Sequence, residues 1–252
     1  MVEKSVLAHA LLPLADDHLI LGHRLSQWCG HAPMLEEDLS MPNLALDLIG
    51  QARNLYGYCA ELLNDGRDED DLAYLRNERQ YRNLLLVERP NGDFGHTMLR
   101  QFYFAVFMQH YWAGLTASTD SRLRDFAGKA VKETAYHIRH CGEWVIRLGD
   151  GTEESASRMR QAVTALHIYC DEMFVATDEQ QQCIEAGILP DNAALRAPWQ
   201  AAVEEVFAEA FLQVPDVANP QEGGRDGRHT EDLGFLLCEL QYMQRAFPGM
   251  TW

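Results

Sequence analysis

The stretch from Ser40 to Leu63, "SMPNLALDLIGQARNLYGYCAELL", repeats apolar residues at helical spacing. The members of the stripe follow one another at intervals of three and four residues: Leu44, Leu48, Ala52, Leu55, Cys59 and Leu62. Such a period places them on one face of an amphipathic α-helix. No run in the chain shows the strict alternation of a half-buried strand. The sequence therefore predicts an all-α fold.

Glycine, serine and proline residues predict where the first helix ends and the second begins. The first helix is expected to end near "SQWCGHAP", where Gly30 suits a left-handed cap. Ser40 is expected to cap the second helix, with Pro42 in its first turn. Gly50 and Gly57 lie two turns apart, and their spacing predicts the close approach of a second helix.

Five or six long helices, each roughly 20 residues, account for most of the chain. Short irregular helix is expected over "LAYLRNERQYRNLLLVE", and long helices over "HTMLRQFYFAVFMQHYWAGL", "EESASRMRQAVTALHIYCDEMFV" and "TEDLGFLLCELQYMQRAF". Pro198 predicts a late start or a kink in its helix. We expect a single domain over residues 1–252, a ferritin-like four-helix bundle with additional peripheral helices.

The charge balance excludes several classes of partner. The formal net charge is -17, and the chain holds only three lysines, Lys4, Lys129 and Lys132. Such a field repels nucleic-acid phosphates and anionic lipid surfaces, so neither is expected as a partner. No signal peptide or membrane-spanning stretch is predicted. Six cysteines without a C-x-x-C pair fit reduced core residues, and we expect a cytoplasmic protein.

The sequence contains incomplete forms of a metal-binding motif that helical bundles use. Di-iron carboxylate bundles use Glu-x-x-His, because residues three apart on a helix point at the same metal. Only Asp93 with His96, and Asp226 with His229, have an acid three residues before a histidine. Both pairs lie at glycine-rich turns rather than within helices. The sequence therefore predicts no metal site.

Three acids in predicted helices lack a histidine at the third following position. The pairs are Asp47 with Gly50, Glu133 with Tyr136, and Glu239 with Tyr242. We interpret these positions as degenerate metal-ligand positions. Glu133 and His137, four residues apart in "KETAYHIRHCGEW", share a helix face, and we favour a hydrogen-bonded pair in a polar core over iron ligation.

The segment "RNERQYRN" concentrates arginine within an acidic chain. Arg76, Arg79 and Arg82 offer forks that suit phosphate groups, and Tyr81 offers a stacking face. This pattern fits a rim that receives an anionic, adenine-bearing group such as coenzyme A. A solvated turn that binds local carboxylates such as Glu78 explains the composition equally well.

The sequence resembles the C components of the bacterial 1,2-phenylacetyl-CoA epoxidases, also called phenylacetate-CoA oxygenases. The resemblance is carried by "WCGHAPMLEEDLSMPNLALDLIGQARN", "NERQYRNLLLVERPNGDF", "KAVKETAYHIRH", "WVIRLGDGT" and "HTEDLGFLLCELQYMQR". It implies a ferritin-like bundle without a metal centre, beside a paralogous catalytic A component that holds the di-iron site. A small B component and a reductase with flavin and iron–sulfur groups complete the complex, which uses NADPH and dioxygen to epoxidise phenylacetyl-CoA.

The same resemblance implies that this chain can touch the CoA end of the substrate. The residues carried over are Gln80, Tyr81, Arg82 and Asn83, with a second group of Gln181, Gln182 and Cys183.

Three hypotheses follow. The first is a non-catalytic structural subunit of the epoxidase in aerobic phenylacetate catabolism. The second is a di-iron oxygenase with unusual ligands, drawn from Asp47, Glu133, His137, His229 and Glu239. The third is a helical scaffold for an unrelated partner.

Overall fold

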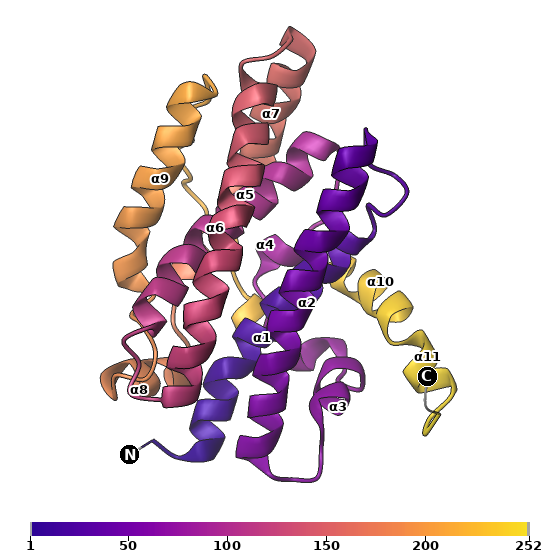
Figure 1. Ribbon diagram of the computed structural model, residues 1–252, viewed down its shortest axis with the longest axis vertical. Coiled ribbons are helices and arrows are strands. Elements are labelled where there is room, and N and C mark those ends of the chain that lie inside the picture. The colour runs from indigo at the N-terminus through magenta and orange to yellow at the C-terminus, as the bar shows by residue number, and fades with distance from the viewer. Residues whose placement is uncertain (1, 251–252) are drawn as a thin grey trace. The chain divides into compact units, whose positions relative to one another are not determined.

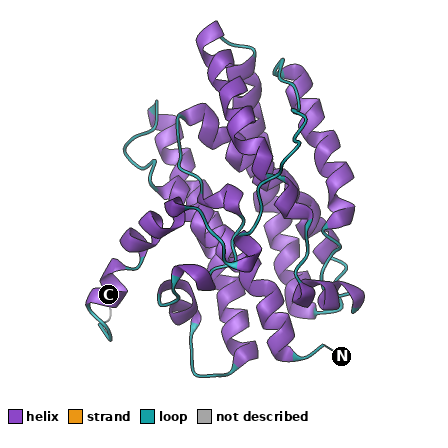
Figure 2. Cartoon of the chain, turned by 180° about the vertical axis from the view of Figure 1, so that it is seen from behind, coloured by secondary structure: helices purple, strands orange, loops and turns teal. Residues whose placement is uncertain are grey.

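The computed structural model describes residues 2–250 and consists of helices joined by loops (Figures 1 and 2). No strand occurs among these residues, so the all-α prediction is confirmed. Contacts divide the chain into two compact units. Unit 1 comprises the chain up to Pro90 together with the part from Glu222 onward, and unit 2 is Asn91–Gln221. The prediction of one domain over residues 1–252 stays a prediction.

Unit 1 is built on a hairpin of two long helices, α1 (Lys4–Ser26) and α2 (Leu35–Leu63). Its other elements are α3 (Glu69–Tyr74), a 3₁₀ turn (Glu78–Gln80), α4 (Leu85–Glu88), a second 3₁₀ turn (Gly224–Asp226), α10 (Glu231–Leu240) and α11 (Tyr242–Ala246). The predicted irregular stretch is thus confirmed as α3, the first 3₁₀ turn and α4. Gln241 separates α10 from α11, so the predicted single last helix is divided in two.

The helix α2 begins five residues before the predicted cap. Ser40 does not cap it, and its hydroxyl instead donates to the Glu36 carbonyl at 2.8 Å. Acidic residues in the first turn, including Glu36, favour the earlier start through the helix dipole. Pro42 lies in the second turn, where only one backbone hydrogen bond is lost. Gly30 has a φ of +79° in the turn after α1 rather than at its cap.

Close packing of α1 against α2 depends on Gly22. A Cβ at Gly22 would lie 2.8 Å from Ile49 Cγ1 and 3.3 Å from the Ala45 carbonyl oxygen. Gly50 and Gly57 do not make this contact, since nothing lies within 4 Å of a Cβ at either residue, and the close approach of another helix at these two positions stays a prediction.

Unit 2 is built on a second long hairpin, α5 (Phe94–Leu115) and α6 (Ser121–Gly149). Side chains of Asp93 and Asp120 cap the two helices by accepting from the backbone N–H groups of His96 and Leu123. The remaining elements are α7 (Glu153–Leu166), 3₁₀ turns at His167–Tyr169 and Asp171–Phe174, α8 (Asp178–Glu185), a 3₁₀ turn at Ala193–Leu195, and α9 (Arg196–Glu209).

The aromatic stretch of α5 forms the core of unit 2. Tyr103 is fully buried and packs against Trp199 and Phe207 of α9, with ring centroids 5.5 and 6.0 Å apart. Trp199 Nε1 donates to the Tyr103 carbonyl at 2.9 Å. Pro198 lies in the first turn of α9, which confirms the late start. The α7 helix ends at Leu166, earlier than predicted, because two 3₁₀ turns follow it.

No helix among residues 2–250 is both long enough and apolar enough to span a membrane.

Candidate functional site

The middle of α6 shows which of its residues face the core. Buried side chains recur at Ala130, Thr134, His137 and Cys141, at intervals of three and four. Tyr136 lies off this stripe. It is 40% exposed, and its ring stacks on that of His140 with centroids 5.9 Å apart. The third position after Glu133 is therefore on the outer side of the helix.

This register changes the interpretation of the degenerate motif. The two buried residues with Glu-x-x-His spacing are Thr134 and His137, so this face has a histidine with a threonine, not an acid, three residues before it. The Thr134 hydroxyl donates to the Ala130 carbonyl at 2.9 Å. His137 Nδ1 lies 3.5 Å from the side-chain nitrogen of Gln101 on α5. The interpretation of Glu133 as a degenerate metal-ligand position stays a prediction.

The acids singled out from the sequence do not form a metal site in either unit. Glu133 lies 3.1 Å from Lys129, one turn earlier on α6. Asp47 is half-buried on α2, and the following Gly50 is exposed. Glu239 is exposed near the end of α10. Within residues 2–250, no group of three or more His, Cys, Asp or Glu side chains is arranged to hold a metal ion.

Two consecutive acids at the middle of α1 were missed by the sequence analysis. Asp16 is fully buried and accepts from the Tyr56 hydroxyl at 2.5 Å, from both terminal nitrogens of Arg76, and from the Arg82 backbone N–H at 2.7 Å. Arg76 also lies over the Tyr81 ring, 4.3 Å from its centroid. The positive charge of Arg76 and these hydrogen bonds together offset the cost of burying the Asp16 carboxylate.

Asp17 receives a second arginine. Arg225 donates to both carboxylate oxygens, at 3.0 and 2.7 Å, and the Leu84 backbone N–H donates at 2.7 Å. Burial raises the pKa of Asp17 to about 6, against the opposing effect of Arg225. The carboxylate is therefore still ionised at neutral pH. Arg225 also donates to the Arg82 carbonyl at 2.7 Å and so fixes the arginine-rich segment to α1.

A third buried acid, Glu88, closes the network around His229. His229 Nδ1 lies 2.8 Å from Glu88 Oε2, and its Nε2 lies 3.0 Å from the Tyr81 carbonyl. Both neighbours are acceptors, so both ring nitrogens must donate, and the ring is protonated. Burial opposes protonation most strongly, but the hydrogen bond to Glu88, the negative charges of Glu88 and Asp16 and the Tyr81 carbonyl together outweigh it, so the pKa of His229 is raised. Thr230 donates to Glu88 Oε1 through its N–H and hydroxyl.

These partners explain why sequence inspection missed the network. The signal available was the run "ADDH", three polar residues inside an otherwise apolar helix. Its partners lie about 40 to 210 residues away along the chain, in irregular segments that carry no periodic pattern.

The first predicted CoA segment has two exposed or half-buried side chains and two buried ones. Tyr81 and Asn83 are fully buried, and the Tyr81 hydroxyl donates to the Ala73 carbonyl at 2.5 Å. The prediction that Tyr81 offers a stacking face is therefore wrong. Gln80 is exposed, and its side-chain oxygen accepts from the Asn77 N–H at 2.7 Å. Arg82 is half-buried and donates to the carbonyls of Arg79 and Tyr81.

The second predicted segment forms part of α8 in unit 2. Gln181 and Gln182 are exposed, and the Gln181 side chain donates to Glu185 at 3.2 Å. Cys183 is fully buried, and burial raises the pKa of its thiol to about 11. A role for these residues in CoA binding stays a prediction.

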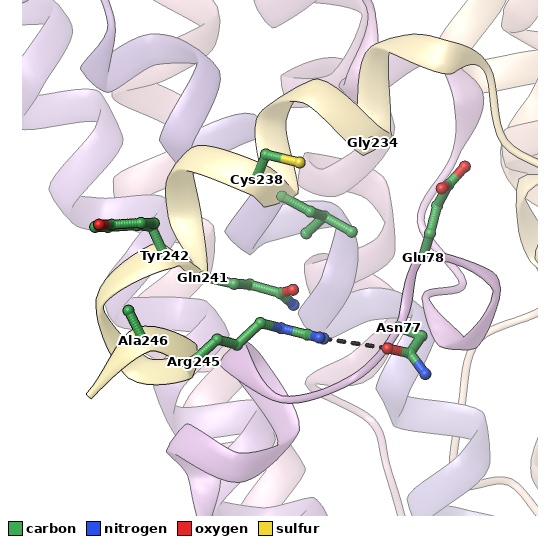
Figure 3. Close-up of a pocket in the computed structure, with 9 residues that line it drawn as sticks. Asn77, Glu78, Gly234, Cys238, Gln241, Tyr242, Arg245 and Ala246 are labelled. Carbon is green, nitrogen blue, oxygen red and sulfur yellow. Dashed lines mark hydrogen bonds between the residues drawn. The ribbon is translucent and has the colours of Figure 1, made fainter. Parts of the chain in front are cut away.

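A groove of about 600 Å³ runs between α10–α11 and the start of the arginine-rich segment (Figure 3). Arg245 crosses it and donates to Asn77 Oδ1 at 3.3 Å and to the Arg76 carbonyl at 2.9 Å. Gln241 on the same side donates to the Tyr81 hydroxyl at 2.8 Å. These bonds hold the two C-terminal helices of unit 1 against the arginine-rich segment.

Comparison with known proteins gives two consistent matches. The family model described as "Phenylacetic acid catabolic protein" matches residues 2–252. The chain is also similar to the C component of the 1,2-phenylacetyl-CoA epoxidase from Escherichia coli (strain K12). The two are 46% identical over 241 residues, which cover 96% of this chain and 97% of the relative. The chain therefore belongs to the phenylacetic acid catabolic protein family.

Proposed function

We propose that this chain is the C component of a cytoplasmic 1,2-phenylacetyl-CoA epoxidase complex in aerobic phenylacetate catabolism. In this role it binds no metal and supports the catalytic A component, which holds the di-iron centre. The B component and a reductase with flavin, iron–sulfur and NADPH sites complete the complex. The similarity to the Escherichia coli protein over almost the full length of both chains supports the assignment.

The observation that carries the non-catalytic role is the register of α6. A bundle ligand pair needs an acid and a histidine three residues apart on the buried face. Here the buried pair is Thr134 and His137, and the threonine hydroxyl is used by its own helix. A neutral hydroxyl supplies neither the charge nor the bridging oxygens that a carboxylate gives to iron.

Contact with the CoA end of the substrate is part of the proposal. Four of the predicted residues have exposed or half-buried side chains and are the proposed contacts: Gln80 and Arg82 in unit 1, and Gln181 and Gln182 in unit 2. Tyr81, Asn83 and Cys183 act by holding these segments in place. The Nη1 atom of Arg82 donates to two carbonyl oxygens. These partners are neutral, so the positive charge of the guanidinium suits a phosphate of CoA.

Reconstitution tests the assignment. The A and B components and the reductase are assayed for phenylacetyl-CoA epoxidation with and without this chain. We expect turnover to require the chain and to be abolished when the iron ligands of the A component are removed. Turnover that persists after the loss of those ligands would support the competing hypothesis of a di-iron oxygenase in this chain.

Arg82→Glu tests the CoA contact. Removing one charge-assisted phosphate contact and adding a repulsive charge should weaken phenylacetyl-CoA binding to the assembled complex by about tenfold or more. Assembly should be retained, because the Asp16 contact uses the Arg82 backbone. Arg228→Glu is the matched control, since Arg228 is exposed and pairs locally with Asp226. Equal affinity in both variants would remove this contact.

A further inference from the structure

One face of α2 is exposed over its first four turns and carries no charged residue there. Its members are Leu35, Leu39, Asn43, Leu46 and Gly50, at intervals of three and four residues. The three leucines are 70%, 61% and 65% exposed. A single exposed leucine is ordinary on a protein surface, but three on one helical stripe mark a contact surface. We call these five residues, together with the half-buried Gly57 two turns further along, the α2 stripe.

The glycines of the α2 stripe are a second, independent observation. Neither Gly50 nor Gly57 has any atom within 4 Å of where a Cβ would lie, so unit 1 itself does not require a glycine at either position. Glycine within a helix is unfavourable for the helix. A glycine on an exposed helix face lets another backbone come close. The leucine side chains offer apolar contact area, and the glycines leave space for a neighbouring backbone. Together they suit the packing of a second helix along α2.

Charge at the edges of the α2 stripe identifies the kind of helix that fits. Glu36 is exposed and Asp47 half-buried beside the leucines. Arg53, the basic residue further along this face, already lies 3.6 Å from Glu69. A second copy of the chain would bring the same acidic edges and a further net charge of -17. A helix with an apolar stripe and basic edges complements this surface, and a copy of the chain does not.

We propose that the α2 stripe binds a helix of the catalytic A component, apolar along the contact and basic at its edges. The inference rests on the proposed function for the identity of the partner. The contact itself is argued from the exposed leucines, the two glycines and the acidic edges of α2.

Paired variants test the contact in binding experiments with the separately purified A component. Leu46→Glu should weaken the affinity by about tenfold or more, since it places a charge at the centre of an apolar contact. Phe235→Glu is the control, because Phe235 is 69% exposed on α10 and the same charge is added. Its affinity should stay within about twofold of the wild type. Circular dichroism should show unchanged helix content for both variants.

Gly50→Leu distinguishes an effect on binding to the A component from an effect on the stability of the chain. The side chain has open space in the free chain and improves helix propensity, so the thermal midpoint should stay or rise. Affinity for the A component should nevertheless fall by about tenfold, because the added side chain blocks close approach. Glu36→Arg should weaken binding as well and reduce its dependence on salt.

The outcomes distinguish this inference from the function on which it rests. A wild-type chain that does not bind the A component would contradict the proposed function. Binding that survives Leu46→Glu and Gly50→Leu would overturn the α2 contact alone, as would equal weakening by Phe235→Glu. A free chain that is dimeric in light scattering and becomes monomeric with Leu46→Glu would assign the stripe to a second copy and also overturn the proposal.

Discussion

The middle of α1 in unit 1 and the middle of α6 in unit 2 both hold buried polar side chains, and these are satisfied in different ways. Asp16 and Asp17 keep their carboxylates, and each is bound by an arginine and a backbone N–H from a distant segment. Thr134 and His137 are satisfied by their own helix and by Gln101 of the neighbouring helix. A buried carboxylate needs a cationic partner, and in unit 1 arginines distant in the sequence supply it. The threonine in α6 is neutral and needs no such partner.

The largest expected effect comes from removing an acid of unit 1. Asp16→Ala leaves Arg76 buried without its carboxylate and should lower the free energy of unfolding by about 3–5 kcal/mol. Thr134→Ala removes a neutral hydrogen bond within unit 2 and should cost only about 1 kcal/mol. Urea unfolding followed by circular dichroism measures both.

If Asp16→Ala does not fold, Asp16→Asn keeps the shape and should give an intermediate loss. Equal costs at Asp16 and Thr134 would contradict the difference between the two helices.

Two glycines sharpen the contrast between the packed and exposed faces of the α1–α2 hairpin. Gly22→Ala forces its Cβ against Ile49 and should destabilise the chain by about 1 kcal/mol or more. Gly50→Ala meets no atom and should stabilise it by about 0.5–1 kcal/mol. Chemical denaturation of the isolated chain gives the sign of each change. The same sign for both variants would show that Gly22 does not set the distance between the two helices.

The smallest effects are expected from two histidines whose pKa values move in opposite directions. The pKa of His229 is raised above its ordinary 6.5, since Glu88, the Tyr81 carbonyl and Asp16 together outweigh burial, so the folded chain binds that proton more tightly than the unfolded chain. Its stabilising contribution is complete below pH 6.5 and is lost as pH rises through the folded-state pKa. Burial lowers the pKa of His167 in unit 2, so stability is lost there as pH falls below 6.5.

Urea midpoints between pH 5 and 9 separate the two contributions. His229→Gln should remove a decline above about pH 6.5, and His167→Gln a decline below it. A pH profile left unchanged by His229→Gln would mean that the imidazole is not held protonated by Glu88.

The sequence predicts the helices well where their pattern is local. The buried apolar face of α2 and the long helix over the aromatic stretch of α5 follow from spacing and residue type, and the structure confirms them. The start of α2 differs from the prediction, because the acidic first turn favours helix more than Ser40 and Pro42 oppose it.

The candidate site is harder to predict, because its parts depend on register and on distant partners. An acid four residues before a histidine suggests Glu133 as the ligand position, but only the observed burial shows that Thr134 shares the buried face of His137. Tyr81 is buried, against the prediction, because Arg76 covers its ring, Gln241 donates to its hydroxyl and Asp16 of α1 binds the next residue, Arg82. No periodic signal in the sequence connects those residues.

Iron content is the most direct test of the proposed metal-free role. The chain is expressed alone in iron-supplemented medium, and its metal is measured by mass spectrometry beside that of the A component prepared in the same way. We expect far less than one iron per chain here and about two per chain in the A component. Two irons per chain in the isolated protein, lost in His137→Ala, would contradict it.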